Sequence, residues 1–360
     1  METKSIELLE ELTNAHGAPG FEGEVREIFK RELAGLGDFH ADKIGSVYCE
    51  TGDCGPRVML EAHMDEVGFR VQNITPDGFI QFVTLGGWWT HSLLSQRVTI
   101  LTHAGEKITG VVCSKPPHFL GLEAREKVLP VEALFIDIGA LSYLNVVNDF
   151  GIMIGDPMVP DSPFTPLSRN DLFLAKAFDN RLGMAGVIEA AQRLDGVSLP
   201  NRAQFAASAQ EEVGLRGAKA LAAKAQPDCA IILEGPPADD TPGMSQAESQ
   251  GRLGGGVQIR MQDPTAIMNP GLCRFAIQVA RELKIPFQVT VRRSGGTDAG
   301  SFHLANEGVP SIVLGTPARY IHSHNAMMNI NDYEAMVALS VGMMERLDQD
   351  TVAGFTDYLS

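Results

Sequence analysis

The chain has 360 residues, of which 44% are apolar and 21% charged, a balance typical of folded globular proteins. Its formal net charge is -16, so its surface repels nucleic acids and other polyanions. No stretch reaches the roughly 20 consecutive apolar residues that span a bilayer, and the polar start METKSIELLEELTNAHG has no apolar signal core. Five cysteines, an odd number, do not suggest a disulfide framework. We therefore expect a cytoplasmic protein with no nucleic-acid or membrane partner.

The start of the chain has the periodicity of two helices. Apolar residues recur every three to four positions in IELLEELTNA, residues 6–15, and in EGEVREIFKRELAGL, residues 22–36. The junction HGAPGF contains the Gly and Pro that interrupt helices. SVYCETG, residues 46–52, and PRVMLEAHMDEVGF, residues 56–69, then predict two strands, and the second ends in a polar cluster.

The pattern changes between Val71 and Pro163. PDG, AGEK and GDP turns separate short β-prone runs such as FIQFV, RVTIL, ITGVV and ALFIDIG, with almost no helical periodicity. From Ser168 onward, apolar runs alternate again with amphipathic helices, which indicates an α/β sheet with helices on both faces. We predict one α/β domain, residues 1–70 and 164–360, interrupted by an inserted β-rich domain at 71–163.

Acids and histidines gather where the apolar runs end. In open α/β sheets, ligands bind beyond the carboxyl ends of the strands, so such residues converge even when they are distant in sequence. The residues that follow a run, or that begin the next helix, are His63, Asp65, Glu66, Asp179, Glu211, Glu212, Glu234, His322 and His324.

This set of side chains favours a metal site. Imidazole and carboxylate ligands without cysteine suit divalent ions such as zinc, cobalt or manganese. The carboxylates exceed the needs of one ion, whereas two ions roughly 3.5–4 Å apart would use one as a bridge and leave one as a base. The adjacent Glu211 and Glu212 suit this division, because one can bind metal while the other faces an attacking water.

Structural roles stay open for several of these residues. His63 and Asp65 can form an ordinary hydrogen-bonded pair, and Asp179 can cap the helix that follows it. Glu211 and Glu212 can be a solvated helix start that the helix dipole favours.

Glu234 is harder to explain without a metal. It follows Ile-Ile-Leu in a predicted buried strand, where an unpaired carboxylate costs free energy. His324 ranks below His322 as a ligand, because a polar surface role would explain it equally well.

Five motifs together resemble one known family. AHMDEVGF, KAFDNRLG, QEEVGLRGA, SGGTDAG and ARYIHSH occur in the order and at the separations seen in the glutamyl aminopeptidase and tetrahedral (TET) aminopeptidase family of dinuclear metallopeptidases. The resemblance covers nearly the whole chain, and LGGWW, KPPHFL and GRLGGG resemble the glutamyl branch in particular. It implies a phosphorylase/hydrolase-like mixed α/β sheet with helices on both faces, plus an inserted small β-barrel or PDZ-like domain.

The resemblance also implies a role for each polar residue. Two divalent ions, zinc or cobalt with manganese as a further option, would have five ligands: His63 and Glu234 on one ion, Glu212 and His322 on the other, and Asp179 bridging both. Glu211 would be the general base, and Asp65 would orient His63. Relatives often carry Asp where this chain has Glu234, which leaves the preferred metal open.

The expected activity is that of a cytosolic aminopeptidase that removes N-terminal residues, preferably Glu or Asp, from short peptides. Arg252, in GRLGGG, is the first candidate for binding an acidic side chain, and Arg319 is the second. The alternatives are a solvated loop residue for Arg252 and an ion-pair partner for Arg319. The family further implies homo-oligomers, tetrahedral dodecamers built from dimers, with subunit contacts through the β-rich domain.

Two other functions stay open. A metal-dependent hydrolase of another substrate class, such as a broad aminopeptidase, a deacylase or an enzyme acting on polysaccharides, would share the metal ligands. The aromatic content of 7%, with two tryptophans, argues against a sugar-stacking cleft. A metal-bound scaffold that has lost catalysis would be expected to lack Glu211, which is present.

Overall fold

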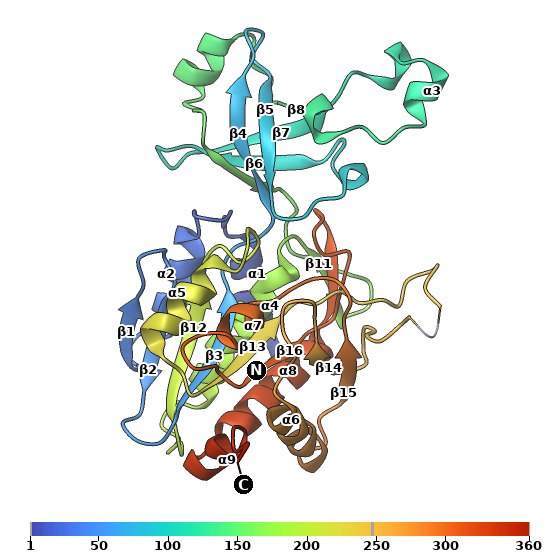
Figure 1. Ribbon diagram of the computed structural model, residues 1–360. Coiled ribbons are helices and arrows are strands. Elements are labelled where there is room, and N and C mark those ends of the chain that lie inside the picture. Colours follow the sequence, from blue (N-terminus) through green and yellow to red (C-terminus); the bar gives the residue numbers. More distant parts are fainter. Residues whose placement is uncertain (1, 246–247, 360) are drawn as a thin grey trace.

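A mixed sheet of eight strands forms the centre of the larger part of the molecule. The computed structural model describes residues 2–245 and 248–359 (Figure 1). The strands, in spatial order, are β1 (Asp38–Ala41), β2 (Val47–Thr51), β12 (Arg202–Ser208), β3 (Arg57–His63), β13 (Cys229–Glu234), β16 (Ser311–Gly315), β14 (Val257–Gln262) and β15 (Phe287–Val291). The four central strands β12, β3, β13 and β16 run parallel, while β2 and β14 pair antiparallel with their inner neighbours.

Helices cover both faces of this sheet, which confirms the predicted α/β class (Figure 1). On one face, α4 (Phe178–Arg193) packs against β3 and β13 and contacts α1 (Glu2–Asn14) and α8 (Ile330–Met344). On the other, α5 (Arg216–Ala225) contacts α7 (Ala299–Phe302). The remaining long helices are α2 (Gly23–Glu32) and α6 (Pro270–Glu282), and α9 (Gln349–Gly354) ends the fold. Among the described residues, no helix has the length and apolarity to cross a membrane.

Close packing of α4 on the sheet depends on a glycine. A Cβ atom on Gly183 would lie 2.5 Å from the carbonyl oxygen of Leu233 in β13, so only glycine lets the two backbones approach this closely. The amino-terminal end of α4, with Asp179, therefore lies beside the carboxyl ends of β3 and β13.

The inserted β-rich segment is a closed six-stranded barrel, which lies above the central sheet in Figure 1. Its strands, in order around the barrel, are β4 (Gly68–Ile74), β5 (Ile80–Leu85), β8 (Phe135–Asp137), β7 (Lys107–Cys113), β6 (Arg97–Leu101) and β9 (Pro157–Pro160). Its interior is a separate apolar cluster that includes Phe69, Phe82 and Ile136. The predicted domain limits at residues 71 and 163 stay a prediction.

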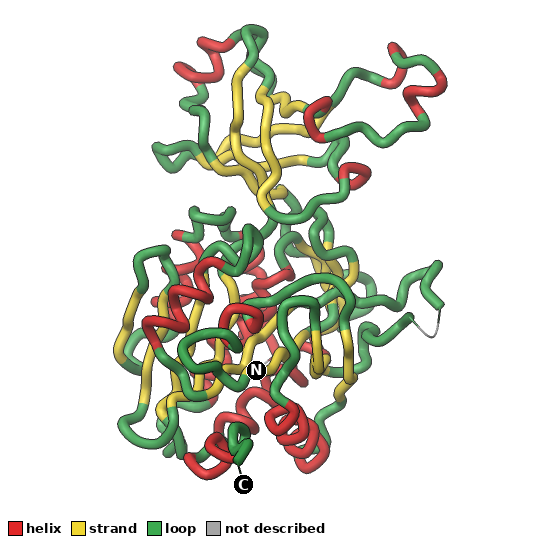
Figure 2. The backbone as a smooth tube through the Cα atoms, in the orientation of Figure 1, coloured by secondary structure: helices red, strands yellow, loops and turns green. Residues whose placement is uncertain are grey.

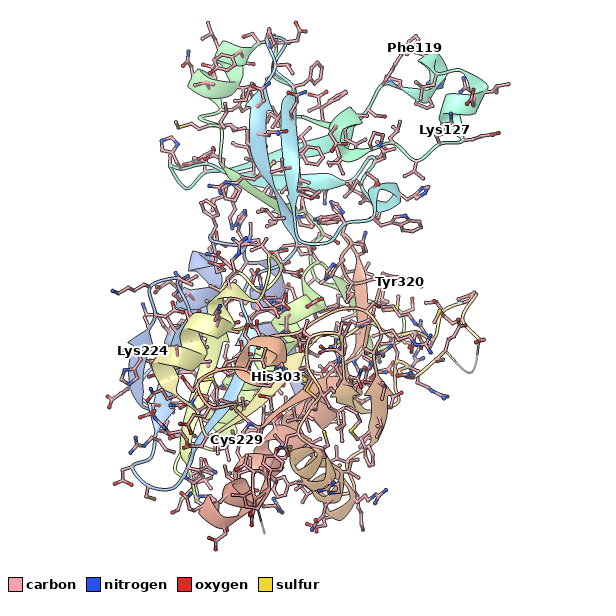
Figure 3. The ribbon with its side chains drawn as sticks, viewed as in Figure 1. Phe119, Lys127, Lys224, Cys229, His303 and Tyr320 are labelled. Carbon is pink, nitrogen blue, oxygen red and sulfur yellow. The ribbon has the colours of Figure 1, made fainter. Side chains whose placement is uncertain are left out.

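An arm links β7 to β8 and projects from the barrel (Figure 2). It contains the short helix α3 (Leu122–Arg125) between two single 3₁₀ turns, Pro117–Phe119 and Val131–Ala133. Figure 3 shows Phe119 and Lys127 on this arm, and the Phe119 side chain is 72% exposed. The motif KPPHFL thus lies on an exposed projection.

The structure contains a second sheet, of four strands, that the sequence analysis did not predict. Its strands are β10 (Thr165–Pro166), β11 (Leu172–Ala175), β18 (Ala326–Asn329) and β17 (Ala318–Arg319). Strands of two to four residues are too short to show periodicity, and long-range pairing defines them instead. The loop between β17 and β18 carries His322, so this sheet holds that residue near the carboxyl end of β13.

Candidate metal centre

The parallel strands bring several predicted ligands to one edge of the central sheet. His63 is the last residue of β3, and Glu234 is the last residue of β13. β12 ends at Ser208, and Glu211 and Glu212 follow shortly after it. Because β12, β3 and β13 are parallel neighbours, their carboxyl ends meet at the same edge.

Asp179 lies between the two candidate histidine ligands. Its Oδ1 atom is 3.2 Å from Nε2 of His63, and its Oδ2 atom is 3.3 Å from Nε2 of His322. The backbone of Asp179 is not helical, with φ at -88° and ψ at 103°, and its side chain does not cap α4. One carboxylate oxygen therefore faces each histidine, which is the arrangement that a bridging ligand requires.

Two further carboxylates complete the cluster. Glu234 Oε2 lies 3.8 Å from Nε2 of His63, and Glu212 Oε2 lies 3.6 Å from Nε2 of His322. Two ligand atoms, each about 2.0–2.2 Å from one tetrahedral ion, lie roughly 3.3–3.6 Å apart. The donor atoms of this chain thus fit two adjacent divalent ions, with small adjustments at Glu234.

Asp65 connects the histidine to the glutamate pair. Its backbone carbonyl accepts a hydrogen bond from Nδ1 of His63 at 3.0 Å, which leaves Nε2 free to face the cluster. Its carboxylate accepts backbone hydrogen bonds from Glu211 at 2.9 Å and from Glu212 at 3.1 Å. A single buried residue therefore orients both His63 and the segment that carries Glu211 and Glu212.

Burial changes the proton affinities of the cluster. It is the main cause that raises the pKa of Glu212 and of Glu234 to about 8, and repulsion from Asp179 adds to it. Burial opposes protonation of His322, but its hydrogen bond to Asp179 and the charge of Glu212 outweigh this and raise its pKa to about 9. Buried carboxylates at this density are stabilised by cations, whether protons or metal ions.

A cavity of about 610 Å³ opens over the cluster. The five candidate ligands and Glu211 line it, together with a wall of small and apolar residues: Gly87, Gly214, Leu215, Pro236, Pro237, Thr265, Ser294, Gly295, Gly296, Thr297 and Ile321. This volume accommodates a ligand the size of a short peptide end. Arg260 is the one other charged residue among the described residues that line the cavity, beside the five candidate ligands and Glu211.

The two arginines that we expected in the pocket do not line it. Arg252 is exposed, and its backbone N–H donates to the side chain of Gln288. Arg319 binds the carboxylate of Asp240 through two hydrogen bonds of 2.6 Å, which is the ion-pair role considered above. The sequence did not identify Asp240 as the partner, because folding alone brings these two distant residues together.

Arg260, which the sequence interpretation missed, lies on β14 and is buried. Its Nη1 atom donates a hydrogen bond of 3.3 Å to the carboxylate of Asp263. Its Nε atom is buried and has no acceptor among the described residues. The sequence feature that could have identified Arg260 is its position in the middle of VQIRMQ, a run that otherwise has the pattern of a half-buried strand.

Two other polar residues from the sequence analysis have structural roles. Glu66 is buried and forms ion pairs with Lys176 at 2.6 Å and Arg181 at 3.1 Å. His324 is buried against Trp88, with ring centroids 5.6 Å apart, and neither ring nitrogen has a hydrogen-bond partner among the described residues. Neither residue lines the cavity.

The profile described as M42 glutamyl aminopeptidase matches residues 45–339, most of the chain. The chain belongs to the M42 glutamyl aminopeptidase family. It is therefore a metallo-aminopeptidase, a hydrolase of peptide bonds, and the resemblance seen in the five motifs is confirmed. A second profile, AMPT, matches residues 3–29.

Relatives within this M42 family differ in their named specificity. The chain is 37% identical to the glutamyl aminopeptidase of Lactococcus lactis, over 96% of this chain and 98% of the relative. It is 31% identical to the lysyl aminopeptidase of Pyrococcus furiosus, over 95% and 97%. Membership of the M42 family thus defines an aminopeptidase without defining the preferred residue.

Solved structures of M42 relatives share the whole fold. A TET aminopeptidase from the archaeon Thaumarchaeota archaeon SCGC AB-539-E09 superposes with a TM-score of 0.95 at 40% identity, covering 98% of this chain and 99% of that one. The Pyrococcus horikoshii TET1 peptidase, described as assembling into a tetrahedron or a large octahedral shell, has a TM-score of 0.86 at 32% identity, with 95% and 100% covered.

Proposed function

We propose that this chain is a dinuclear aminopeptidase that removes N-terminal Glu or Asp from short peptides. The observation that carries the dinuclear part is the position of Asp179, which offers one oxygen to each histidine. The ligands would be His63 and Glu234 on one ion, Glu212 and His322 on the other, and Asp179 on both. Zinc and cobalt suit these nitrogen and oxygen donors, with manganese as a further option.

Divalent ions bound there would polarise the scissile carbonyl and lower the pKa of the attacking water. Glu211 is the proposed general base. Its carboxylate lines the cavity, with Oε2 3.9 Å from Nε2 of His63, and is not needed as a ligand in this assignment. Glu211 accepts the proton of the water and passes it to the leaving amine. Asp65 holds the backbone N–H of Glu211 and so limits where this carboxylate can move.

Arg260 is the proposed determinant of the acidic preference. Four carboxylates line the cavity, those of Asp179, Glu211, Glu212 and Glu234, and they repel an acidic side chain unless cations compensate them. Arg260 supplies such a cation at the cavity wall, since only Nη1 of its guanidinium donates to Asp263 among the residues that the structure describes. Burial strengthens the attraction, and a guanidinium binds a carboxylate through two hydrogen bonds.

The proposed assembly is a homo-oligomer, a tetrahedral dodecamer built from dimers with contacts through the barrel. The barrel and its arm expose large apolar side chains that subunit contacts could bury: Phe119, Leu122, Leu141, Leu144 and Ile154. The assembly named for the Pyrococcus horikoshii relative supports the same proposal. The cytoplasmic location stays a prediction from composition.

A substrate screen tests the proposed activity. The protein is stripped with a chelator, reloaded with zinc, cobalt or manganese, and assayed on glutamyl, aspartyl, lysyl, leucyl and alanyl p-nitroanilides. We expect no turnover without metal, and the highest kcat/KM on glutamyl and aspartyl substrates after reloading. Full activity in the presence of the chelator would refute the metal-dependent mechanism, and a preference for lysyl or leucyl substrates would refute the role given to Arg260.

A further inference from the structure

The loop that follows β5 brings the backbone of the barrel into the metal centre. The carbonyl oxygen of Gly87 lies 2.9 Å from Nδ1 of His322. A carbonyl only accepts hydrogen bonds, so Nδ1 of His322 carries the proton. The lone pair of Nε2 is then free on the side of Asp179 and Glu212, as metal binding requires.

The two histidines of the cluster are held by different parts of the molecule. Nδ1 of His63 bonds to the carbonyl of Asp65, two residues further along the same segment. Nδ1 of His322 bonds instead to a residue of the inserted segment. The loop between β17 and β18 holds His322 in a left-handed conformation, with φ at 56°, which non-glycine residues seldom adopt. The carbonyl of Gly87 supports this ring from outside its own loop.

Trp88 anchors the loop to the barrel. Its indole Nε1 donates to the carbonyl of Gly68 at 3.1 Å, and its ring stacks on Phe69 with centroids 4.6 Å apart. Gly68 and Phe69 are the first residues of β4, so the position of Gly87 depends on this strand of the barrel.

The two glycines of LGGWW differ in how closely other residues approach them. A Cβ atom on Gly86, whose φ is 82°, would lie 2.7 Å from Val67 and 3.1 Å from Oε2 of Glu212. A Cβ atom on Gly87 would lie 3.3 Å from Nδ1 of His322, which is tight but is not combined with a positive φ. The loop thus lies against Glu212 and His322, the two non-bridging ligands of one proposed ion.

We infer that the Gly87 carbonyl is a positioning group for the ion site of His322 and Glu212, so that seating of the barrel controls occupancy of this site and not of the His63–Glu234 site. The inference rests on the proposed dinuclear centre. Binding at the His322 site is coupled to how the barrel sits on the α/β domain, whereas His63 and Glu234 are the last residues of β3 and β13 in the central sheet.

Gly87→Ala tests the inference, because the added methyl group pushes the His322 ring by a few tenths of an ångström without straining the backbone. The stripped protein is titrated with Zn²⁺ by calorimetry, and bound zinc is counted by mass spectrometry after dialysis. We expect one ion bound as in the wild type and the other weakened about 10-fold or more, as loss of a ligand's supporting contact usually causes. The matched control is Gly121→Ala, where a Cβ atom meets nothing within 4 Å.

Trp88→Phe is the second variant. It keeps an aromatic ring against Phe69, removes the bond to Gly68 and reduces the contact with His324, so we expect the same site to weaken by a smaller factor. Two ions at wild-type affinity in Gly87→Ala, or equal weakening of both, would overturn the inference while leaving the dinuclear proposal intact. A wild-type protein that binds a single ion would overturn the dinuclear proposal itself. If Gly87→Ala does not fold, unchanged zinc affinities in Trp88→Phe overturn the inference.

Discussion

Asp179 lies beside His322, with its Oδ2 atom 3.3 Å from Nε2 of that histidine. Its other oxygen faces His63, so loss of this one carboxylate would remove a ligand from both proposed ions. We expect Asp179→Ala to lower the metal content at both sites and His322→Ala to lower it at one. Elemental analysis after dialysis measures the difference, with the exposed His91→Ala as control. An Asp179→Ala protein that retains two ions would contradict the bridging role.

Glu211→Gln is expected to stop turnover without removing metal. The amide cannot accept the proton of the attacking water, while all five proposed ligands remain, so kcat should fall about 10²- to 10⁴-fold. Steady-state kinetics and metal analysis on the same preparation give the result. The exposed Glu307→Gln is a control for the loss of one charge. If Glu211→Gln loses metal as well, Glu211 is a ligand rather than the base.

The stability of the metal-free protein should depend on pH in a defined direction. The pKa values of Glu212 and Glu234 are raised from 4.5 to about 8, so the folded chain holds these protons more tightly than the unfolded chain. Their contribution is present at low pH and is lost as the pH rises through 8. The Tm of the stripped protein should therefore fall between about pH 4.5 and 8.

Metal binding should reverse this trend, because divalent ions replace the protons. The difference in Tm between zinc-loaded and stripped protein is expected to increase with pH. Glu234→Gln should reduce this dependence, since its amide does not titrate. Differential scanning calorimetry provides both curves, and a Tm difference that does not change with pH would show that these carboxylates do not exchange protons for metal.

Arg260→Gln is expected to raise the KM for glutamyl substrates selectively. A hydrogen bond to a charged group contributes about 1.5–3 kcal/mol, roughly a 10- to 100-fold change in binding. Glutamine can still bond to Asp263 but carries no charge, and leucyl substrates should be affected much less. Arg252→Gln is the matched control, because Arg252 is exposed and outside the cavity lining. An equal effect on both substrates would remove Arg260 from acidic recognition.

Subunit contacts through the barrel predict smaller particles when its apolar surface is changed. Leu141 is 88% exposed and Leu144 is 64% exposed, so replacing both with serine should leave the fold intact and weaken association. Deletion of residues 71–163 should have the same effect on mass, although it also removes Gly87. Light scattering coupled to size exclusion measures the particle mass. A monomeric wild-type protein would contradict the proposed assembly.

The class of fold and the residue types of the candidate site could be predicted from the sequence. Alternating strand and helix patterns are local, and they place His63 and Glu234 at strand ends without knowledge of the contacts. Five motifs then identified the family from residue types and order alone. The barrel, too, was visible in its turns and short β-prone runs, because these signals span only a few residues.

Which arginine lies in the cavity and which group holds His322 depend on contacts between segments that are distant in the sequence. Arg319 is occupied by Asp240, and Arg260 lines the cavity from β14, because the paths of the intervening loops depend on contacts between distant segments. The bond from His322 to Gly87 likewise joins the inserted barrel to a loop near the end of the chain. A backbone carbonyl has no sequence signature, so such a contact emerges only when packing brings the two segments together.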